Sequence, residues 1–127
     1  MNMQAAITAC FSKYATFTGR ASRSEYWWFY LFNTVLGYLI QIANSVYVLA
    51  HPDVAHLENM YFFMLIPLWI PSLAAAVRRL HDVGKSGWNM LWCFTIIGAI
   101  PVVIWLAKMG SAEENQYGPP IVLAPAQ

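Results

Sequence analysis

The residues best suited to chemistry lie in one short charged segment, Arg78–Trp88, with the sequence Arg-Arg-Leu-His-Asp-Val-Gly-Lys-Ser-Gly-Trp. Its Gly-Lys-Ser ends like a phosphate-binding loop, but Arg79 occupies the position of the required earlier glycine, so we do not expect nucleotide binding. His81 and Asp82 could form a base with its orienting carboxylate, or part of a metal site. Neighbours in sequence rarely point at one atom, and no second His or Cys stands at ligand spacing. We therefore expect an ordinary loop histidine and no metal.

The two cysteines, Cys10 and Cys93, make neither a disulfide framework nor a metal site. We expect Cys93 within a membrane span and Cys10 on the cytoplasmic face, where both act as small apolar residues. No other combination of side chains predicts a catalytic centre. We therefore assign no catalytic residue and no cofactor, and predict that the chain is not an enzyme.

Composition points to a membrane protein. The chain is 59% hydrophobic and only 10% charged, whereas a soluble domain carries about 25% charged residues. A helix needs about 20 residues, each rising about 1.5 Å, to cross about 30 Å of hydrocarbon. We predict one all-α membrane domain over 1–127, a helical bundle with three transmembrane helices. The predicted spans are 26–50, 59–77 and 87–107, followed by a polar tail over 108–127.

The distribution of basic residues predicts how the chain is oriented. Basic residues precede the first span and follow the second, whereas the loop His51–Glu58 has no Lys or Arg. By the positive-inside rule, the N-terminus and the loop Arg78–Lys85 are cytoplasmic. Three spans then place the tail outside, although Lys108 argues weakly against this. The net charge of +1 gives no indication of nucleic-acid binding.

The segment before the first span predicts a short amphipathic helix over about 3–16. Its apolar stripe consists of Met3, Ala6, Ile7, Cys10, Phe11 and Tyr14. The helix could lie among the lipid headgroups or pack its stripe against the spans. Ser22-Arg23-Ser24-Glu25 then has the form of a capping box that opens the first span.

Polar and small residues recur on one face of the first span: Asn33, Gly37, Gln41 and Asn44. We expect this face to pack on another helix, because amide groups and small residues favour interhelical contact in lipid. The alternative is a polar transport pathway at mid-membrane. That alternative is weaker, since no Asp, Glu, Lys, Arg or His lies deep in any span.

Four sequence blocks carry a resemblance to a known family: Phe17–Trp28, Arg78–Asp82, Ser86–Trp88 and Asn115–Pro119. In combination and order they resemble the bacterial inner-membrane proteins of domain-of-unknown-function family 805, the YhaH-like group. Asn89 and Glu113 depart from the family pattern and affect local turn geometry. The resemblance implies a small multi-pass inner-membrane protein, and the family brings no reaction or ligand with it.

If the N-terminus and the second loop share one side, their charges meet at a single edge of the membrane. This charged rim consists of Arg20, Arg23, Glu25, Arg78, Arg79, His81 and Asp82. We predict that Glu25 pairs with Arg78 or Arg79, and Asp82 with Arg20 or Arg23, because unpaired carboxylates are costly where water is scarce. The remaining positive excess predicts binding of anionic lipid headgroups or of an acidic segment of a partner.

We favour a non-enzymatic membrane protein that acts through helix–helix or rim contacts with itself, with lipids or with a membrane-protein partner. A small transporter, channel or transport accessory subunit is the alternative, and it would need oligomerisation to enclose a path. Third comes an enzyme acting on lipid headgroups. Its only candidate site would be Arg23, Glu25, Arg78, His81 and Asp82.

Overall fold

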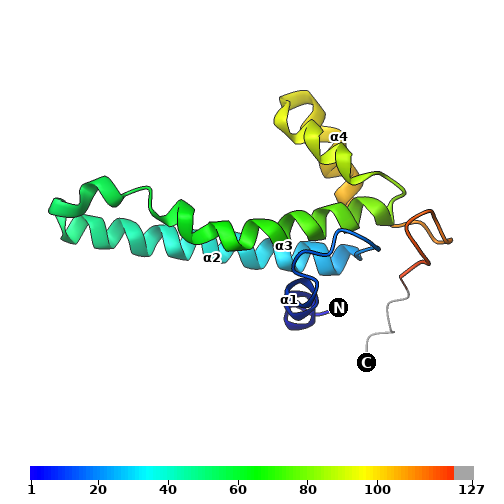
Figure 1. The fold of residues 1–127 in the computed structure, drawn as a ribbon, viewed down its shortest axis with the longest axis horizontal. Helices are drawn as coiled ribbons and strands as arrows, with labels where there is room; N and C mark the ends of the chain where they lie inside the picture. The colour runs from blue at the N-terminus through cyan, green and yellow to red at the C-terminus, as the bar shows by residue number, and fades with distance from the viewer. Residues whose placement is uncertain (122–127) are drawn as a thin grey trace.

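The computed structural model describes residues 1–121 and is built from helices (Figure 1). In chain order these are the α-helices and 3-10 helices (η) α1 (Met3–Ser12), α2 (Arg23–Ala50), η1 (Pro52–Leu57), α3 (Tyr61–Asp82), η2 (Gly87–Phe94) and α4 (Ile96–Ala107). The all-α class is confirmed.

Helices α2 and α3 form a long antiparallel hairpin joined by η1 (Figure 1). At about 1.5 Å per residue, the 28 residues of α2 extend for about 42 Å, more than the hydrocarbon thickness. The segments 23–50 and 52–82 are each long and apolar enough to cross a membrane. Ser22 caps α2, since its Oγ accepts from the Glu25 N–H at 3.1 Å. Only half of the predicted capping box forms, because the Glu25 side chain turns toward Arg78.

Two residues of the polar face of α2 contact α3, and a third contacts the turn before α3. Asn33 Nδ2 donates to Ser72 Oγ at 2.9 Å, and Asn44 Nδ2 donates to the Glu58 carbonyl at 2.7 Å. Gly37 faces Leu65. Gln41 differs from its neighbours, because its side chain is exposed on the outside of the hairpin.

The N-terminal helix α1 packs against the first turns of α2. Asn2 caps it by accepting from the Ala5 N–H at 2.8 Å, and Ala6 and Cys10 are buried. The Phe11 ring meets the Phe29 ring edge to face at 5.6 Å between centroids. The helix ends at Ser12, four residues before the predicted boundary, and Figure 1 shows it crossing the hairpin near one end.

The predicted third span, 87–107, is not one helix, and this prediction is corrected. The 3-10 helix η2 ends at Phe94, Thr95 is extended, and α4 begins at Ile96. Thr95 breaks the helix because its Oγ1 accepts from the Gly98 N–H at 3.0 Å and so caps α4. Figure 1 shows η2 and α4 as a short hairpin that projects sideways from the end of α3.

The described part of the tail, 108–121, also differs from prediction. The Ser111 N–H donates to the Asp82 carbonyl at 2.8 Å, so the tail folds back on the end of α3. It therefore lies on the same side as the loop Arg78–Lys85, and the predicted placement on the opposite side is wrong. The remaining tail residues, 122–127, lie outside the described part of the chain.

The core sits at one end of the α2–α3 hairpin. It is formed by Cys10, Tyr26, Phe29, Ala75, Ala76, Leu80, Val102 and Leu106. Within residues 1–121, no residue from 30 to 70 is buried. The buried end is the one that carries the charged rim.

Candidate functional site

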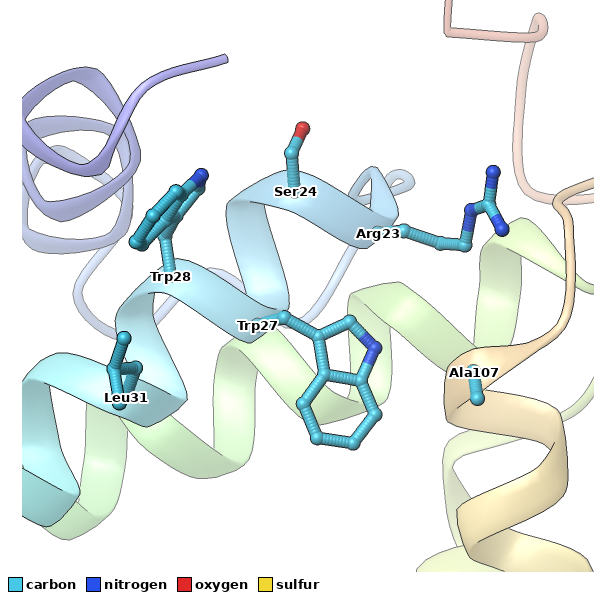
Figure 2. Close-up of a pocket in the computed structure, with 6 residues that line it drawn as sticks. All are labelled: Arg23, Ser24, Trp27, Trp28, Leu31 and Ala107. Atoms are coloured by element: carbon cyan, nitrogen blue, oxygen red, sulfur yellow. The ribbon is translucent and has the colours of Figure 1, made fainter.

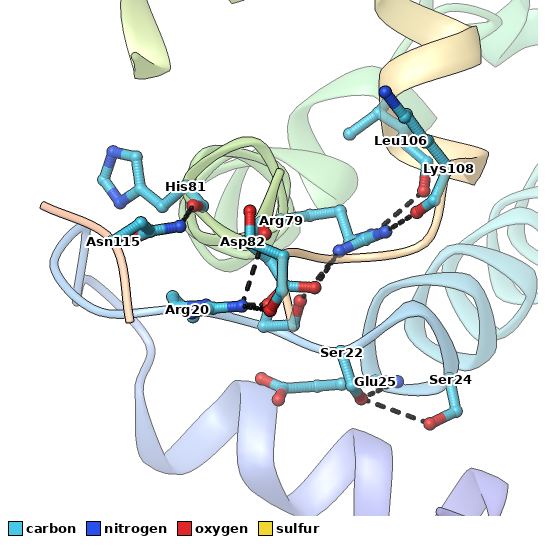
Figure 3. A network of polar contacts seen from close by, with 12 residues as sticks. Arg20, Ser22, Ser24, Glu25, Arg79, His81, Asp82, Leu106, Lys108 and Asn115 are labelled. Carbon is cyan, nitrogen blue, oxygen red and sulfur yellow. Dashed lines mark hydrogen bonds and ion pairs between the residues drawn. The ribbon is translucent and has the colours of Figure 1, made fainter. Parts of the chain in front are cut away.

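Six of the seven residues of the charged rim are buried together where three segments of the chain meet. These segments are the loop before α2, the end of α3 and the tail after α4 (Figure 3). The exception is Arg23, whose side chain is exposed.

Asp82 is the centre of the first ion-pair cluster. Its Oδ1 accepts from Arg20 Nε at 2.8 Å, and its Oδ2 accepts from Arg79 Nη1. Asp82 is 5% exposed, so one carboxylate is shared by two buried guanidinium groups (Figure 3). The predicted pairing of Asp82 with Arg20 is confirmed, and Arg79 joins it from one helical turn earlier.

Glu25 and Arg78 form the second pair, with Arg78 Nη1 2.5 Å from Glu25 Oε1. The predicted pairing of Glu25 with Arg78 is confirmed. Cys10 from α1 completes this cluster, since its Sγ lies 3.9 Å from the same Glu25 oxygen as a weak donor. Burial and, to a smaller extent, the Glu25 charge raise the pKa of the Cys10 thiol to about 11. The thiol is therefore protonated at neutral pH and is a poor nucleophile.

Arg79 also holds the end of α4. Its Nε donates to the Leu106 carbonyl at 3.0 Å and its Nη2 donates to the Lys108 carbonyl. The last carbonyls of a helix lack partners within the helix and carry partial negative charge, so a guanidinium group stabilises them. One side chain thus joins α3, the Asp82 carboxylate and α4.

Arg20 holds the tail in the same way. Its Nη2 donates to the Ser111 carbonyl at 2.6 Å, and its Nη1 donates to the Glu113 and Gly118 carbonyls at 3.1 and 3.3 Å. Gly110 makes the close approach possible, because a Cβ there would lie 1.9 Å from Asp82 Oδ2.

His81 is buried in the last turn of α3, whereas the sequence predicted a position in a loop. Its Nδ1 lies 3.0 Å from the Gly19 carbonyl, which can only accept, so this nitrogen carries a proton. The imidazole stacks on the Tyr117 ring, with centroids 3.9 Å apart and planes 4° apart. Asn115 Nδ2 donates to the His81 carbonyl at 2.9 Å. The block Asn115–Pro119 therefore closes over the end of α3.

The buried part of the rim holds three guanidinium groups and two carboxylates. Backbone carbonyls of the loop, of α4 and of the tail receive most of the remaining N–H groups. Among the described residues, Arg78 Nε and Nη2 are buried with no hydrogen-bond partner, in a side chain that is only 1% exposed. Both carboxylates are ion-paired, so this cluster joins segments of the chain.

Arg23 is placed differently from the other arginines. It lines an open pocket of about 530 Å³ with Ser24, Trp27, Trp28, Leu31 and Ala107. Figure 2 shows its side chain extending from the start of α2 toward the segment after α4, with Trp27 also turned toward α4. This pocket combines an exposed positive charge with aromatic walls.

Sequence reasoning missed the residues of α4 and of the tail that complete the cluster. They are Leu106 in α4 and Lys108, Gly110, Ser111, Glu113, Asn115, Tyr117 and Gly118 in the tail. Many of them contribute backbone carbonyls, for which side-chain patterns give no signal. Two signals were present. Lys108 argued against a tail on the far side, and the block Asn115–Pro119 was distinctive but had no role assigned to it.

Within residues 1–121 the structure brings together no group of three or more His, Cys, Asp and Glu side chains that could hold a metal ion.

Comparison with known proteins gives one family and several relatives. The family model DUF805, described as a protein of unknown function, matches residues 14–119. The chain is 36% identical over 106 residues to the inner membrane protein YhaI of Escherichia coli (strain K12), covering 83% of this chain and 85% of the relative. It is 28% identical over 113 residues to the inner membrane protein YhaH of the same organism, covering 88% and 92%. No solved structure matches.

Proposed function

Because this chain belongs to the DUF805 family, we propose that it is a non-enzymatic inner-membrane protein that acts by assembling with a second copy of itself through α2. The inner-membrane location is that of its relatives, the inner membrane proteins YhaI and YhaH. The observation that carries the assembly is the outward position of Gln41.

Gln41 belongs to a polar stripe on the outer face of α2. Tyr38, Gln41 and Ser45 are all exposed and stand three and four residues apart, which places them on one side of the helix. Gln41 lies nine residues before the end of α2, about 14 Å along the helix axis, and so within the hydrocarbon. An amide that faces lipid there has no water to replace a missing hydrogen-bond partner.

A second copy of the same helix supplies that partner. An amide side chain carries both donors and an acceptor, so two glutamines can exchange hydrogen bonds across a symmetric interface. Each such interhelical bond stabilises by about 0.6 kcal/mol on average, so packing along the stripe, with the small Ser45 allowing close approach, contributes the rest. The two other amides of α2, on Asn33 and Asn44, are already bonded within the chain.

The exposed basic residues orient the assembly. Arg23, Lys13, Lys85 and Lys108 remain exposed around the rim, while the other arginines are buried. We place this rim and the N-terminus at the cytoplasmic leaflet, where each free Lys or Arg is attracted by about 1 kcal/mol to anionic lipids. In this arrangement the pocket at Arg23 faces the headgroups, so anionic phospholipid is the lipid partner.

The test is the oligomeric state of the full chain in lipid nanodiscs, with Gln41→Leu as the variant and Ile42→Leu as its control on the same helix. We expect a dimer for the wild type and the control, and a shift to monomer for Gln41→Leu, measured by light scattering and by crosslinking through Ser45→Cys. A monomeric wild type, or a Gln41→Leu variant that remains dimeric, contradicts the proposal. Co-purification of a different membrane protein whose binding depends on Gln41 would place that partner on the stripe instead.

A further inference from the structure

The two legs of the η2–α4 hairpin have matching lengths, and both are too short to cross a membrane. Eight residues of 3-10 helix rise about 16 Å at about 2.0 Å each. Twelve residues of α-helix rise about 18 Å at about 1.5 Å each. The hydrocarbon core of a bilayer is about 30 Å thick, so each leg matches about one leaflet.

Both feet of this hairpin are fixed at the rim. At the first foot, the Lys85 N–H donates to the Leu80 carbonyl at 2.9 Å, and Gly87 lies so close to Val77 that a Cβ would come within 2.7 Å of it. At the second foot, Arg79 Nε donates to the Leu106 carbonyl and the Ser111 N–H donates to the Asp82 backbone carbonyl. The chain therefore enters and leaves this hairpin on one side.

The tip of the hairpin is apolar and uncovered. Phe94, Ile96 and Ile97 are 88%, 92% and 84% exposed. No charged residue occurs from 86 to 107. Part of the backbone at the turn is paired locally, since the Thr95 N–H donates to the Trp92 carbonyl and Thr95 Oγ1 accepts from the Gly98 N–H. Local pairing of this kind lowers the cost of placing an irregular segment in hydrocarbon.

The geometry points to a re-entrant hairpin: η2 and α4 lie within the acyl region of the rim-side leaflet, with the acyl chains of that leaflet as their binding partner. The chain then crosses the bilayer twice, through α2 and α3. Lipid is the occupant because the feet fix the tip about one leaflet away from the charged rim. Trp88 and Trp105, near the two feet, lie at headgroup depth, where tryptophan collects.

The absence of a polar side on α4 separates this hairpin from an interfacial helix. A helix that lies in the headgroup plane needs one polar face, as α1 has in Gln4, Thr8 and Ser12. Helix α4, Ile-Ile-Gly-Ala-Ile-Pro-Val-Val-Ile-Trp-Leu-Ala, has none. We therefore place α4 among the acyl chains and not in the headgroup plane.

The first arm of the test is topology. Single cysteines at Glu114, Ser86 and Asp53 are introduced into a Cys10→Ala, Cys93→Ala background and labelled with a membrane-impermeant maleimide in sealed vesicles of known orientation. We expect Glu114→Cys and Ser86→Cys to react from one side and Asp53→Cys from the other. Reaction of Glu114→Cys from the Asp53 side would mean a third crossing and overturn the inference. If Cys10→Ala prevents folding, Cys10 is kept, because its buried thiol competes poorly for the reagent.

The second arm is depth. A bimane fluorophore at Ile97→Cys, near the tip, is compared with one at Leu39→Cys, an exposed position near the middle of α2. Quenching is measured with lipids that carry a nitroxide high or low on the acyl chain. We expect both Ile97→Cys and Leu39→Cys to be quenched about twofold more by the deep nitroxide than by the shallow one, because legs of about 16–18 Å cross one leaflet and bring the tip close to the bilayer centre.

Each other outcome overturns the inference. Strongest quenching of Ile97→Cys by the shallow nitroxide would mean that the hairpin lies flat near the headgroups instead of entering the leaflet. Quenching of Leu39→Cys but not of Ile97→Cys by either lipid would show that protein covers the hairpin. The result does not depend on assembly through Gln41, since both arms apply equally to monomer and dimer.

Discussion

The two ends of the α2–α3 hairpin are built on different principles. At the rim end, three arginines, two carboxylates and His81 are buried among α1, α4 and the tail. At the far end, η1 joins the helices with no buried residue of its own, and the Asn44 side chain makes a single hydrogen bond to the Glu58 carbonyl. The same two helices thus carry a specific tertiary structure at one end and only a local turn at the other.

The difference shows where specificity comes from in a small membrane protein. Apolar side chains gain little by leaving lipid for protein, because lipid tails are as apolar as leucine. Polar groups near the membrane edge gain more from fixed partners, since water is scarce there. The chain therefore buries its charges and leaves its apolar residues exposed, as in the exposed Phe63 and Trp69 of α3.

The largest effect should follow from Asp82→Asn. This change leaves Arg20 and Arg79 buried without their shared counter-ion, and removal of one partner of a buried pair typically costs about 3–5 kcal/mol. Asp53→Asn, in exposed η1, should stay within about 0.5 kcal/mol of the wild type. Free energies of unfolding would be measured by denaturant titration in detergent micelles. If the two substitutions lowered the free energy of unfolding equally, the rim end would be no more important for stability than the end at η1.

A second, smaller effect separates the two clusters within the rim. A double-mutant cycle of Glu25→Gln with Arg78→Gln should give a coupling of about 2 kcal/mol, because the pair is buried and charge-assisted. The matched cycle of Glu25→Gln with Arg79→Gln should be nearly additive, since Arg79 pairs with Asp82. Unfolding in detergent gives both values. Additivity in both cycles would reduce the Glu25 cluster to a solvated group of charges.

The pairing at the rim could be predicted from the sequence because its members flank spans. Once 26–50 and 59–77 are taken as crossing helices, Glu25 and Arg78 must lie at the same edge of the membrane. Their opposite charges then predict an ion pair. The choice between Arg78 and Arg79 could not be made. It depends on the rotation of α3 about its axis, which places Arg79 toward α4 and Arg78 toward Glu25.

The third apolar segment shows what composition cannot tell. Residues 87–107 are apolar enough for a span, but the helix breaks at Thr95. The Thr95 side chain caps α4, and Gly98 allows its close approach, since a Cβ at Gly98 would lie 2.3 Å from Thr95 Oγ1. Hydropathy counts such residues as minor interruptions. The position of the tail depended on this break, which is why both predictions failed together.

The smallest effect should come from the far end, with Asn44→Ala. Its amide makes one hydrogen bond, from α2 to the Glu58 carbonyl in the turn, at 2.7 Å. Interhelical side-chain hydrogen bonds in a membrane protein contribute about 0.6 kcal/mol on average, and we expect a similar value here. Asn33→Ala, which removes the bond to Ser72 on the same face but nearer the rim, is the matched comparison. Both are measured by unfolding in detergent, and both should fall well below Asp82→Asn. If Asn44→Ala cost as much as Asp82→Asn, then η1 would be holding the two helices in register, and the far end would be a second centre of structure instead of a simple turn.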